Sequence, residues 1–177
     1  MMKKIISVYP QLEFDEMMEK MGLNDENVEN ETDLAIISIC GCKDAIAFWG
    51  DTEEHWFKQN HSNVLNLDFD DVYEENIDYT VNADGEEKTY HFNGMKMEQA
   101  REAIKFIEAN LGKNFIVHCR AGQSRSQGFF RFMVNNYSDY FSYISGNPYR
   151  LCFTPNSLVV SQLKRAYMEK EGIIEKE

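Results

Sequence analysis

The nine residues from His118 to Ser126, HCRAGQSRS, constrain this chain of 177 residues more than any other stretch. The apolar, β-branched run at 114–117 predicts a buried strand, and the apolar run at 126–136 predicts a buried helix. A tight loop between a strand and a helix directs backbone N–H groups and the positive end of the helix dipole toward one point. The sequence therefore predicts an anion site in this loop.

The residue types in the loop suit phosphate chemistry. Cys119 opens it with a potential thiolate nucleophile, and a helix N-terminus with a nearby cation can lower a thiol pKa from about 8.5 to roughly 3.5–7.5. Arg125 closes it with a planar fork that can hold two phosphate oxygens. Gly122 lets the backbone turn inward, and the Ser126 hydroxyl would stabilise a departing thiolate. The alternative is a buried cysteine at a strand end beside a surface arginine.

The Cys-x5-Arg spacing, with His118 before it and Ser126 after it, resembles the signature of the cysteine-based protein tyrosine phosphatases. Within that superfamily it is most similar to the dual-specificity and the bacterial or phage branches, over about 34–136. The resemblance implies a phosphomonoester hydrolase with a phospho-cysteine intermediate, with Cys119 as nucleophile, His118 in support, and no metal or cofactor. The residues it implies for phosphate binding are Arg120, Ala121, Gly122, Gln123, Ser124 and Arg125.

Hydrolysis also needs a proton donor for the leaving oxygen, usually a carboxylic acid. In the phosphatases that this chain resembles, the acid follows a strand upstream of the cysteine loop. The sequence Leu-Asp-Phe-Asp-Asp at 67–71 resembles their Phe-x-Asp form, which points to Asp71, with Asp70 as the alternative acid. Asp71 precedes Cys119 by more residues than is typical, so Asp78 and Asp84 stay open. An acidic, solvated turn is the other explanation of this cluster.

Apolar patterning elsewhere predicts strands alternating with helices. We expect strands at 3–9, Leu34–Cys40 and 64–69, and a hairpin with Asp84-Gly85 at its turn. The predicted helices cover Gln11–Met21, 94–111 with Gly112 as its cap, 137–146, and 154–171, with another helix beginning at 51–54. This order predicts one α/β domain over 1–177, a mostly parallel twisted sheet wrapped by helices. The resemblance implies a protein tyrosine phosphatase-like fold.

The carboxyl ends of parallel strands meet at one edge, where ligands bind. Cys40, the acidic turn and the Cys119 loop should therefore share one face, with the hairpin near its mouth, either selecting substrates or as a surface insertion. Cys40 raises a redox hypothesis, because some lipid phosphatases of the superfamily carry a cysteine at this strand end. A Cys40–Cys119 disulfide would form under oxidation, with Cys42 as the fallback partner, unless Cys40 is inert core.

Composition bears on partners and location. The net charge of −12 disfavours nucleic acid and anionic membranes as partners. The four cysteines form no disulfide framework, and neither a signal peptide nor a stretch of transmembrane length is present, so we expect a cytoplasmic protein. His55 and His61 lack the spacing of metal ligands and are expected on the surface.

Two functions follow from these features. The first is a protein-tyrosine or dual-specificity phosphatase whose substrates are phosphorylated proteins or small aryl phosphates. The second is a pseudo-phosphatase, a module that binds phosphoproteins without turnover. The sequence predicts neither the natural substrate nor the oligomeric state.

Overall fold

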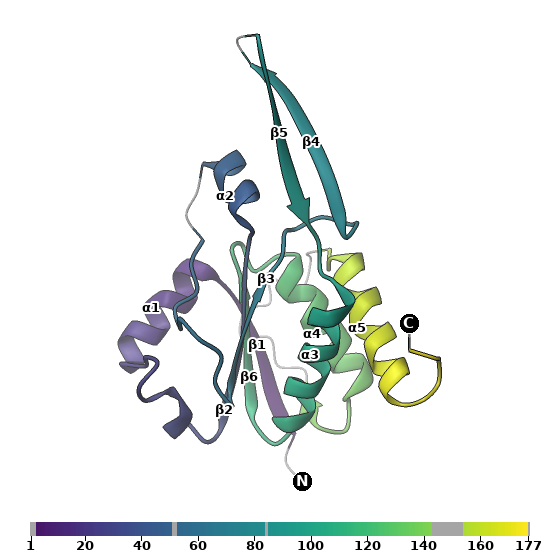
Figure 1. The fold of residues 1–177 in the computed structure, drawn as a ribbon. Helices are drawn as coiled ribbons and strands as arrows, with labels where there is room; N and C mark the ends of the chain where they lie inside the picture. Colours follow the sequence, from purple (N-terminus) through teal and green to yellow (C-terminus); the bar gives the residue numbers. More distant parts are fainter. Residues whose placement is uncertain (1–2, 51–52, 84, 143–153, 177) are drawn as a thin grey trace.

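Five parallel strands form a sheet at the centre of the fold (Figure 1). The computed structural model describes residues 3–50, 53–83, 85–142 and 154–176. The strand order is β3-β2-β6-β1-β7. Their bounds are β1 Lys4–Pro10, β2 Leu34–Cys40, β3 Val64–Asp68, β6 Asn114–Cys119 and β7 Phe141–Ser142.

The central strands are buried on both faces, as their continuous apolar sequences predict. In β2, every residue after Leu34 is buried, and the same holds in β6 after Asn114. Ile37 of β2 lies opposite Val117 of β6, and Ser38 lies opposite His118. This α/β architecture with a parallel sheet agrees with the predicted fold class.

Helices cover both faces of this sheet (Figure 1). On one face, α1 (Gln11–Met21) and the short 3-10 helix η1 (Val28–Asn30) pack around Phe14, Met18 and Ile36. On the other face, α3 (Met97–Ala109), α4 (Arg125–Asn136) and α5 (Ser157–Lys170) enclose the larger core. Alternate residues of one strand enter the two cores, since Ile36 packs in the first and Ile37 in the second.

A two-stranded hairpin, β4 (Asn76–Ala83) and β5 (Glu86–Asn93), projects from the fold beside α2 (Lys43–Trp49) (Figure 1). The predicted pairing is confirmed, because Tyr79 faces Tyr90 and Val81 faces Lys88. The Phe48 ring of α2 makes edge-to-face contacts with Tyr79, Tyr90 and Phe92, at 4.9–5.6 Å between ring centroids. These aromatic contacts attach the hairpin to α2.

The bounds of three predicted helices are wrong. In the region of the helix predicted to begin at 51–54, the helix is α2, Lys43–Trp49, which is followed by Gly50 (φ +67°) as its C-cap, whereas 53–55 is not helical; 51–52 lie outside the described residues. Helix α3 begins at Met97 rather than at 94, and it ends at Ala109 with Asn110 as its C-cap, rather than at 111 with Gly112 as its cap. Helix α5 begins at Ser157 because the side chain of Asn156 accepts a hydrogen bond from the Val159 N–H, which makes Asn156 the N-cap.

The predicted helix at 137–146 is also wrong over its described part. Phe141 and Ser142 form β7, which pairs in parallel with Lys4 and Ile5 of β1. The rest of that segment, including Ile144, lies outside the described residues. Among the described helices, none is both long and apolar enough to cross a membrane.

Candidate active site

The 119–125 loop joins the end of β6 to the start of α4, as the sequence predicts. Gly122 has a φ of +66°, and a Cβ built on it would lie 2.8 Å from the backbone nitrogen of Pro10. Only glycine fits this close approach of the loop to the β1–α1 junction. The Gln11 N–H donates to the Arg120 carbonyl at 3.1 Å, and Gln127 Nε2 donates to the Gly122 carbonyl at 3.0 Å. The loop is therefore fixed from both sides.

Cys119 lies at the base of this loop and is 2% exposed. Its Sγ lies 3.0 Å from the Oγ of Ser126, which is fully buried in the first turn of α4. A hydroxyl at this distance can donate a hydrogen bond to a thiolate, and the N-terminus of α4 adds partial positive charge. The structure thus places Ser126 beside Cys119, where its hydroxyl is expected to stabilise a thiolate.

Arg125 is held in place by two groups outside the loop. Its Nη1 donates to the Phe69 carbonyl at 2.9 Å, and its Nη2 lies 3.4 Å from both carboxylate oxygens of Glu53. Burial lowers the pKa of Arg125, but the charges of Cys119 and Glu53 outweigh burial and raise that pKa above its usual value. The buried Nε of Arg125 has no hydrogen-bond partner within the described ranges. The Nε–H donor of the guanidinium is therefore left unused by the described residues.

Glu53 is a residue of the site that the sequence does not predict. Its side chain is 8% exposed, and its Oε2 accepts a hydrogen bond from the Gly41 N–H at 2.6 Å. The carboxylate therefore connects the end of β2 to Arg125. No local pattern predicts this role, because Glu53 and Arg125 are 72 residues apart.

The adjacent carboxylates Asp70 and Asp71 have different surroundings. Asp71 is exposed and lines the cleft, and its Oδ1 accepts hydrogen bonds from Ser124 Oγ at 2.7 Å and from Asn156 Nδ2 at 2.8 Å. Asp70 is 2% exposed, and its two oxygens accept from the backbone N–H groups of Cys42 and Asn93, each at 2.7 Å. Asp70 therefore joins α2 to the hairpin, whereas Asp71 lies against the 119–125 loop.

Of the two remaining acid candidates, Asp78 is not brought to the loop. Asp78 lies on the hairpin, where its Oδ1 is 2.7 Å from Nδ1 of His91, and both side chains are largely exposed. Asp84 lies outside the described residues. Among the described candidates, Asp71 is thus the acid that contacts a loop residue directly.

Asn156 is a second residue of the site that the sequence does not predict. It is fully buried, and its Nδ2 donates to Asp71 Oδ1 and to the Val72 carbonyl, while its backbone N–H donates to the Ser124 carbonyl. One residue therefore holds the candidate acid and the start of α5 through its side chain and the loop through its backbone N–H. Its position before an apolar helical run could have predicted the N-cap, but not the contact with Asp71.

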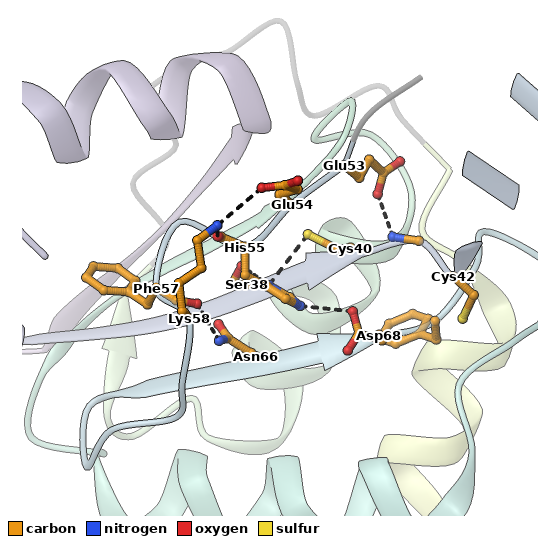
Figure 2. Close-up of polar contacts among 12 residues, drawn as sticks. Ser38, Cys40, Cys42, Glu53, Glu54, His55, Phe57, Lys58, Asn66 and Asp68 are labelled. Atoms are coloured by element: carbon orange, nitrogen blue, oxygen red, sulfur yellow. Dashed lines mark hydrogen bonds and ion pairs between the residues drawn. The ribbon is translucent and has the colours of Figure 1, made fainter. Parts of the chain in front are cut away.

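Cys40 and Cys119 lie on opposite faces of the sheet. Cys40 Sγ is 3.5 Å from Nδ1 of His55, on the face of Ser38 (Figure 2). Cys119 instead packs with Val117 and Phe129 in the core on the other face. Burial raises the pKa of the Cys40 thiol to about 12, and burial likewise raises that of Cys42 to about 12. The geometry therefore does not support the Cys40–Cys119 disulfide, because one side chain would have to change face.

The expectation that His55 and His61 lie on the surface is wrong. The His61 side chain is 7% exposed and its Nε2 lies 2.8 Å from Asp25 Oδ1. The His55 side chain is 15% exposed and lies between β2 and β3, with its Nε2 3.0 Å from Asp68 Oδ1 (Figure 2). Both rings are held by a carboxylate that the sequence spacing does not reveal.

A cleft of about 810 Å³ opens above the loop. Its polar floor comes from the 119–125 loop together with Glu53, Asp70 and Asp71. Its apolar wall comes from α2 and the hairpin, through Ile46, Phe48, Ile77, Tyr79 and Phe92. The hairpin therefore forms part of the cleft, as the substrate-selecting alternative expects.

No cluster of three or more histidine, cysteine, aspartate or glutamate side chains in the described ranges has the geometry of a metal site. No protein-family model, curated protein or solved structure matches this chain. Functional inference therefore rests on the residues of this cleft.

Proposed function

We propose that this protein is a cysteine-dependent phosphomonoester hydrolase of the protein tyrosine phosphatase type. The observation that carries the proposal is the convergence of three groups on one cleft, the Cys119 thiol, the Arg125 guanidinium and the Asp71 carboxylate. A buried nucleophile, a fixed cation and an acid are what transfer of a phosphoryl group to sulfur requires. We infer a protein tyrosine phosphatase-like fold from the same loop and from the parallel sheet that supports it.

In the first step, the Cys119 thiolate attacks phosphorus while the bond from phosphorus to the leaving oxygen breaks. The guanidinium of Arg125 and the backbone N–H groups of the loop stabilise the equatorial phosphate oxygens. The leaving oxygen takes its proton from Asp71. Because both hydrogen bonds to Asp71 fall on Oδ1, we assign the transferred proton to Oδ2.

In the second step, water cleaves the phospho-cysteine. The Asp71 carboxylate accepts a proton from the attacking water, and the bond from phosphorus to sulfur breaks. The departing thiolate accepts a hydrogen bond from Ser126 Oγ, which lies 3.0 Å away. The products are inorganic phosphate and the free thiolate, and no metal or cofactor takes part.

The cleft wall favours aryl phosphates over alkyl phosphates. Phe48, Tyr79 and Phe92 line the same cleft as the 119–125 loop, and aromatic rings prefer such edge-to-face surroundings. We therefore infer phosphotyrosine, in a protein or as a small aryl phosphate, as the preferred substrate. A catalytic thiolate also requires a reducing compartment, which supports a cytoplasmic location.

Hydrolysis of an aryl phosphate by three variants tests this proposal. Cys119→Ser should abolish turnover because it removes the nucleophile, and Arg125→Ala because it removes the phosphate ligand. Cys42→Ser is the matched control, since it removes a neighbouring thiol that has no role in the mechanism. Retention of more than a few per cent of activity by Cys119→Ser would refute the covalent mechanism. Phosphate binding without hydrolysis by the wild type would support the phosphoprotein-binding alternative.

A further inference from the structure

A continuous hydrogen-bonded chain runs from the protein surface to the residue before Cys119. Asp68 Oδ1 lies 3.0 Å from His55 Nε2, and His55 Nδ1 lies 2.7 Å from Ser38 Oγ (Figure 2). Ser38 Oγ in turn lies 2.7 Å from His118 Nε2. The Asp68 side chain is 67% exposed, whereas Ser38 and His118 are fully buried. None of these contacts belongs to the reaction proposed above.

The donors and acceptors along this chain have one consistent arrangement when both histidines are neutral. The Asp68 carboxylate can only accept, so His55 carries its proton on Nε2 and its Nδ1 accepts from the Ser38 hydroxyl. Because that hydroxyl has a single proton, its oxygen must accept from His118, which then carries its proton on Nε2. Burial lowers the pKa of His118 to about 3, so this imidazole is neutral at pH 7.

The other neighbours of the chain agree with this arrangement. His118 Nδ1 is buried and has no hydrogen-bond partner in the described ranges, so a proton there would be unsatisfied. The Cys40 thiol, 3.5 Å from His55 Nδ1, stays protonated and acts as a second, weak donor to the same lone pair. Among the described residues, the titratable and charged groups that act on the chain include Asp15 from α1, Glu53, and Arg125 from α4, besides Asp68 and His55 themselves.

His118 connects this chain of hydrogen bonds to the 119–125 loop. Its ring stacks on Phe14 of α1, with 3.9 Å between centroids and 14° between planes, and its backbone leads directly into Cys119. Phe14 holds the ring through one face and Ser38 holds its Nε2, so the end of β6 is fixed from both neighbouring elements. The position of the Cys119 sulfur depends on this strand end.

We propose that Asp68, His55 and Ser38 are positioning residues that hold His118 as its Nε2–H tautomer and thereby fix the placement of the nucleophile. The role in catalysis rests on the function proposed above, whereas the tautomer does not. The Asp68 carboxylate accepts from His55 Nε2–H and so leaves His55 Nδ1 as an acceptor. The Ser38 hydroxyl donates to that Nδ1 and accepts from His118 Nε2–H. The three residues touch neither the substrate phosphate nor the reacting sulfur.

Nuclear magnetic resonance tests the tautomer directly. In ¹⁵N-labelled protein at pH 7, long-range ¹H–¹⁵N correlations should show His118 as a single Nε2–H tautomer, assigned by its loss in His118→Gln. Ser38→Ala should abolish that single tautomer. Asp68→Ala, at an exposed side chain that does not threaten folding, should do the same, whereas Asp68→Asn keeps an oxygen acceptor and should preserve it. An Nδ1–H tautomer in the wild type would overturn the proposal.

Steady-state kinetics with an aryl phosphate tests the positioning role. Ser38→Ala and Asp68→Ala should each lower kcat by about tenfold, with KM and inhibition by inorganic phosphate changed by less than about twofold. Asp68→Asn should recover most of the activity. Asp78→Ala is the matched control, because it removes the exposed partner of His91 on the hairpin. Equal losses in Asp78→Ala and Asp68→Ala, or wild-type kcat in Ser38→Ala, would overturn the positioning role.

Failure of the proposed function is distinguishable from failure of this inference. If the wild type hydrolyses no phosphomonoester, the proposed function is wrong, and the tautomer measurement still decides whether the chain of hydrogen bonds orders His118. If the wild type is active but the tautomer is unaffected by Ser38→Ala and Asp68→Ala, the inference is wrong and the proposed function stands.

Discussion

At the scale of single residues, Asp70 and Asp71 show how neighbours in sequence acquire different roles. Asp70 is buried with both oxygens satisfied by backbone N–H groups, whereas Asp71 is exposed in the cleft beside Ser124. A carboxylate that accepts two backbone hydrogen bonds in the interior is a structural element. We therefore assign the proton transfer to Asp71.

Replacing each carboxylate by its amide separates these roles. Asp71→Asn should lower kcat by about 10²–10⁴-fold for a poor leaving group and much less for a good one, because it removes a general acid. Asp70→Asn should destabilise the fold by about 1–3 kcal/mol, since one amide N–H group would face a backbone donor. Kinetics with phenyl and nitrophenyl phosphates, together with urea unfolding, measures both effects. A folded Asp70→Asn protein that is selectively inactive on phenyl phosphate would reverse the assignment.

Asn156 combines an N-cap with a contact to the acid. Asn156→Ala should cost about 0.5–2 kcal/mol of stability through the lost cap. It should also lower kcat by about tenfold, because Asp71 loses a hydrogen bond that fixes its position. Asn156→Ser is the control, since serine restores a cap but is too short to hold Asp71. If Asn156→Ser restores kcat along with stability, the contact with Asp71 has no catalytic importance.

The buried imidazole of His118 makes stability depend on pH. Burial lowers its pKa from 6.5 to about 3, so the unfolded chain binds a proton between these values that the folded protein does not. The contribution to stability is therefore complete above about pH 6.5 and is lost as the pH falls toward about 3. Between pH 7 and pH 5, the free energy of unfolding should therefore fall by about 2 kcal/mol through His118.

Urea unfolding of the wild type and His118→Gln at these two pH values measures this contribution. The variant lacks the titrating group, so its free energy of unfolding should fall less on acidification, by about 2 kcal/mol. Equal pH dependence in the two proteins would contradict this prediction, because it would show that His118 takes up a proton in the folded state between pH 7 and pH 5.

At the scale of elements, the hairpin and α2 build the apolar wall of the cleft through Phe48, Tyr79 and Phe92. We predict that Phe48→Ala and Tyr79→Ala each lower kcat/KM for a phosphotyrosine peptide by about tenfold and leave that for a phosphothreonine peptide unchanged. Tyr140→Ala is the control, because Tyr140 contacts Lys4 at the amino end of the sheet, away from the cleft. Equal losses on both peptides would exclude a role of the wall in selecting aryl phosphates.

The sequence predicts best the elements whose apolar residues recur in the pattern that packing in or against the sheet requires. The bounds of β2 and α1 agree with the expectation because both are specified by continuous or periodic burial. The bounds of helix α2 could not be predicted, because its seven residues pack against the hairpin. Strand β7 has two residues and exists through its pairing with β1, which no local pattern reveals.

At the scale of the whole molecule, the parallel direction of the strands brings the residues of the site together. The ends of β2, β3 and β6 meet at one edge, which brings Gly41, Asp71 and Cys119 to the same cleft. The loop and the candidate acid could be predicted because each follows a recognisable strand. Glu53 and Asn156 could not, because their contacts span 72 and 85 residues and depend on the completed fold.

The central claim is that Cys119 carries the phosphoryl group during turnover. The most direct measurement is rapid acid quenching of the wild type during hydrolysis of an aryl phosphate, followed by digestion and mass spectrometry. The account predicts a phosphoryl group on the sulfur of Cys119 and none in Cys119→Ser, which should be inactive. Turnover with no label on Cys119, or with the label on another residue, would contradict it.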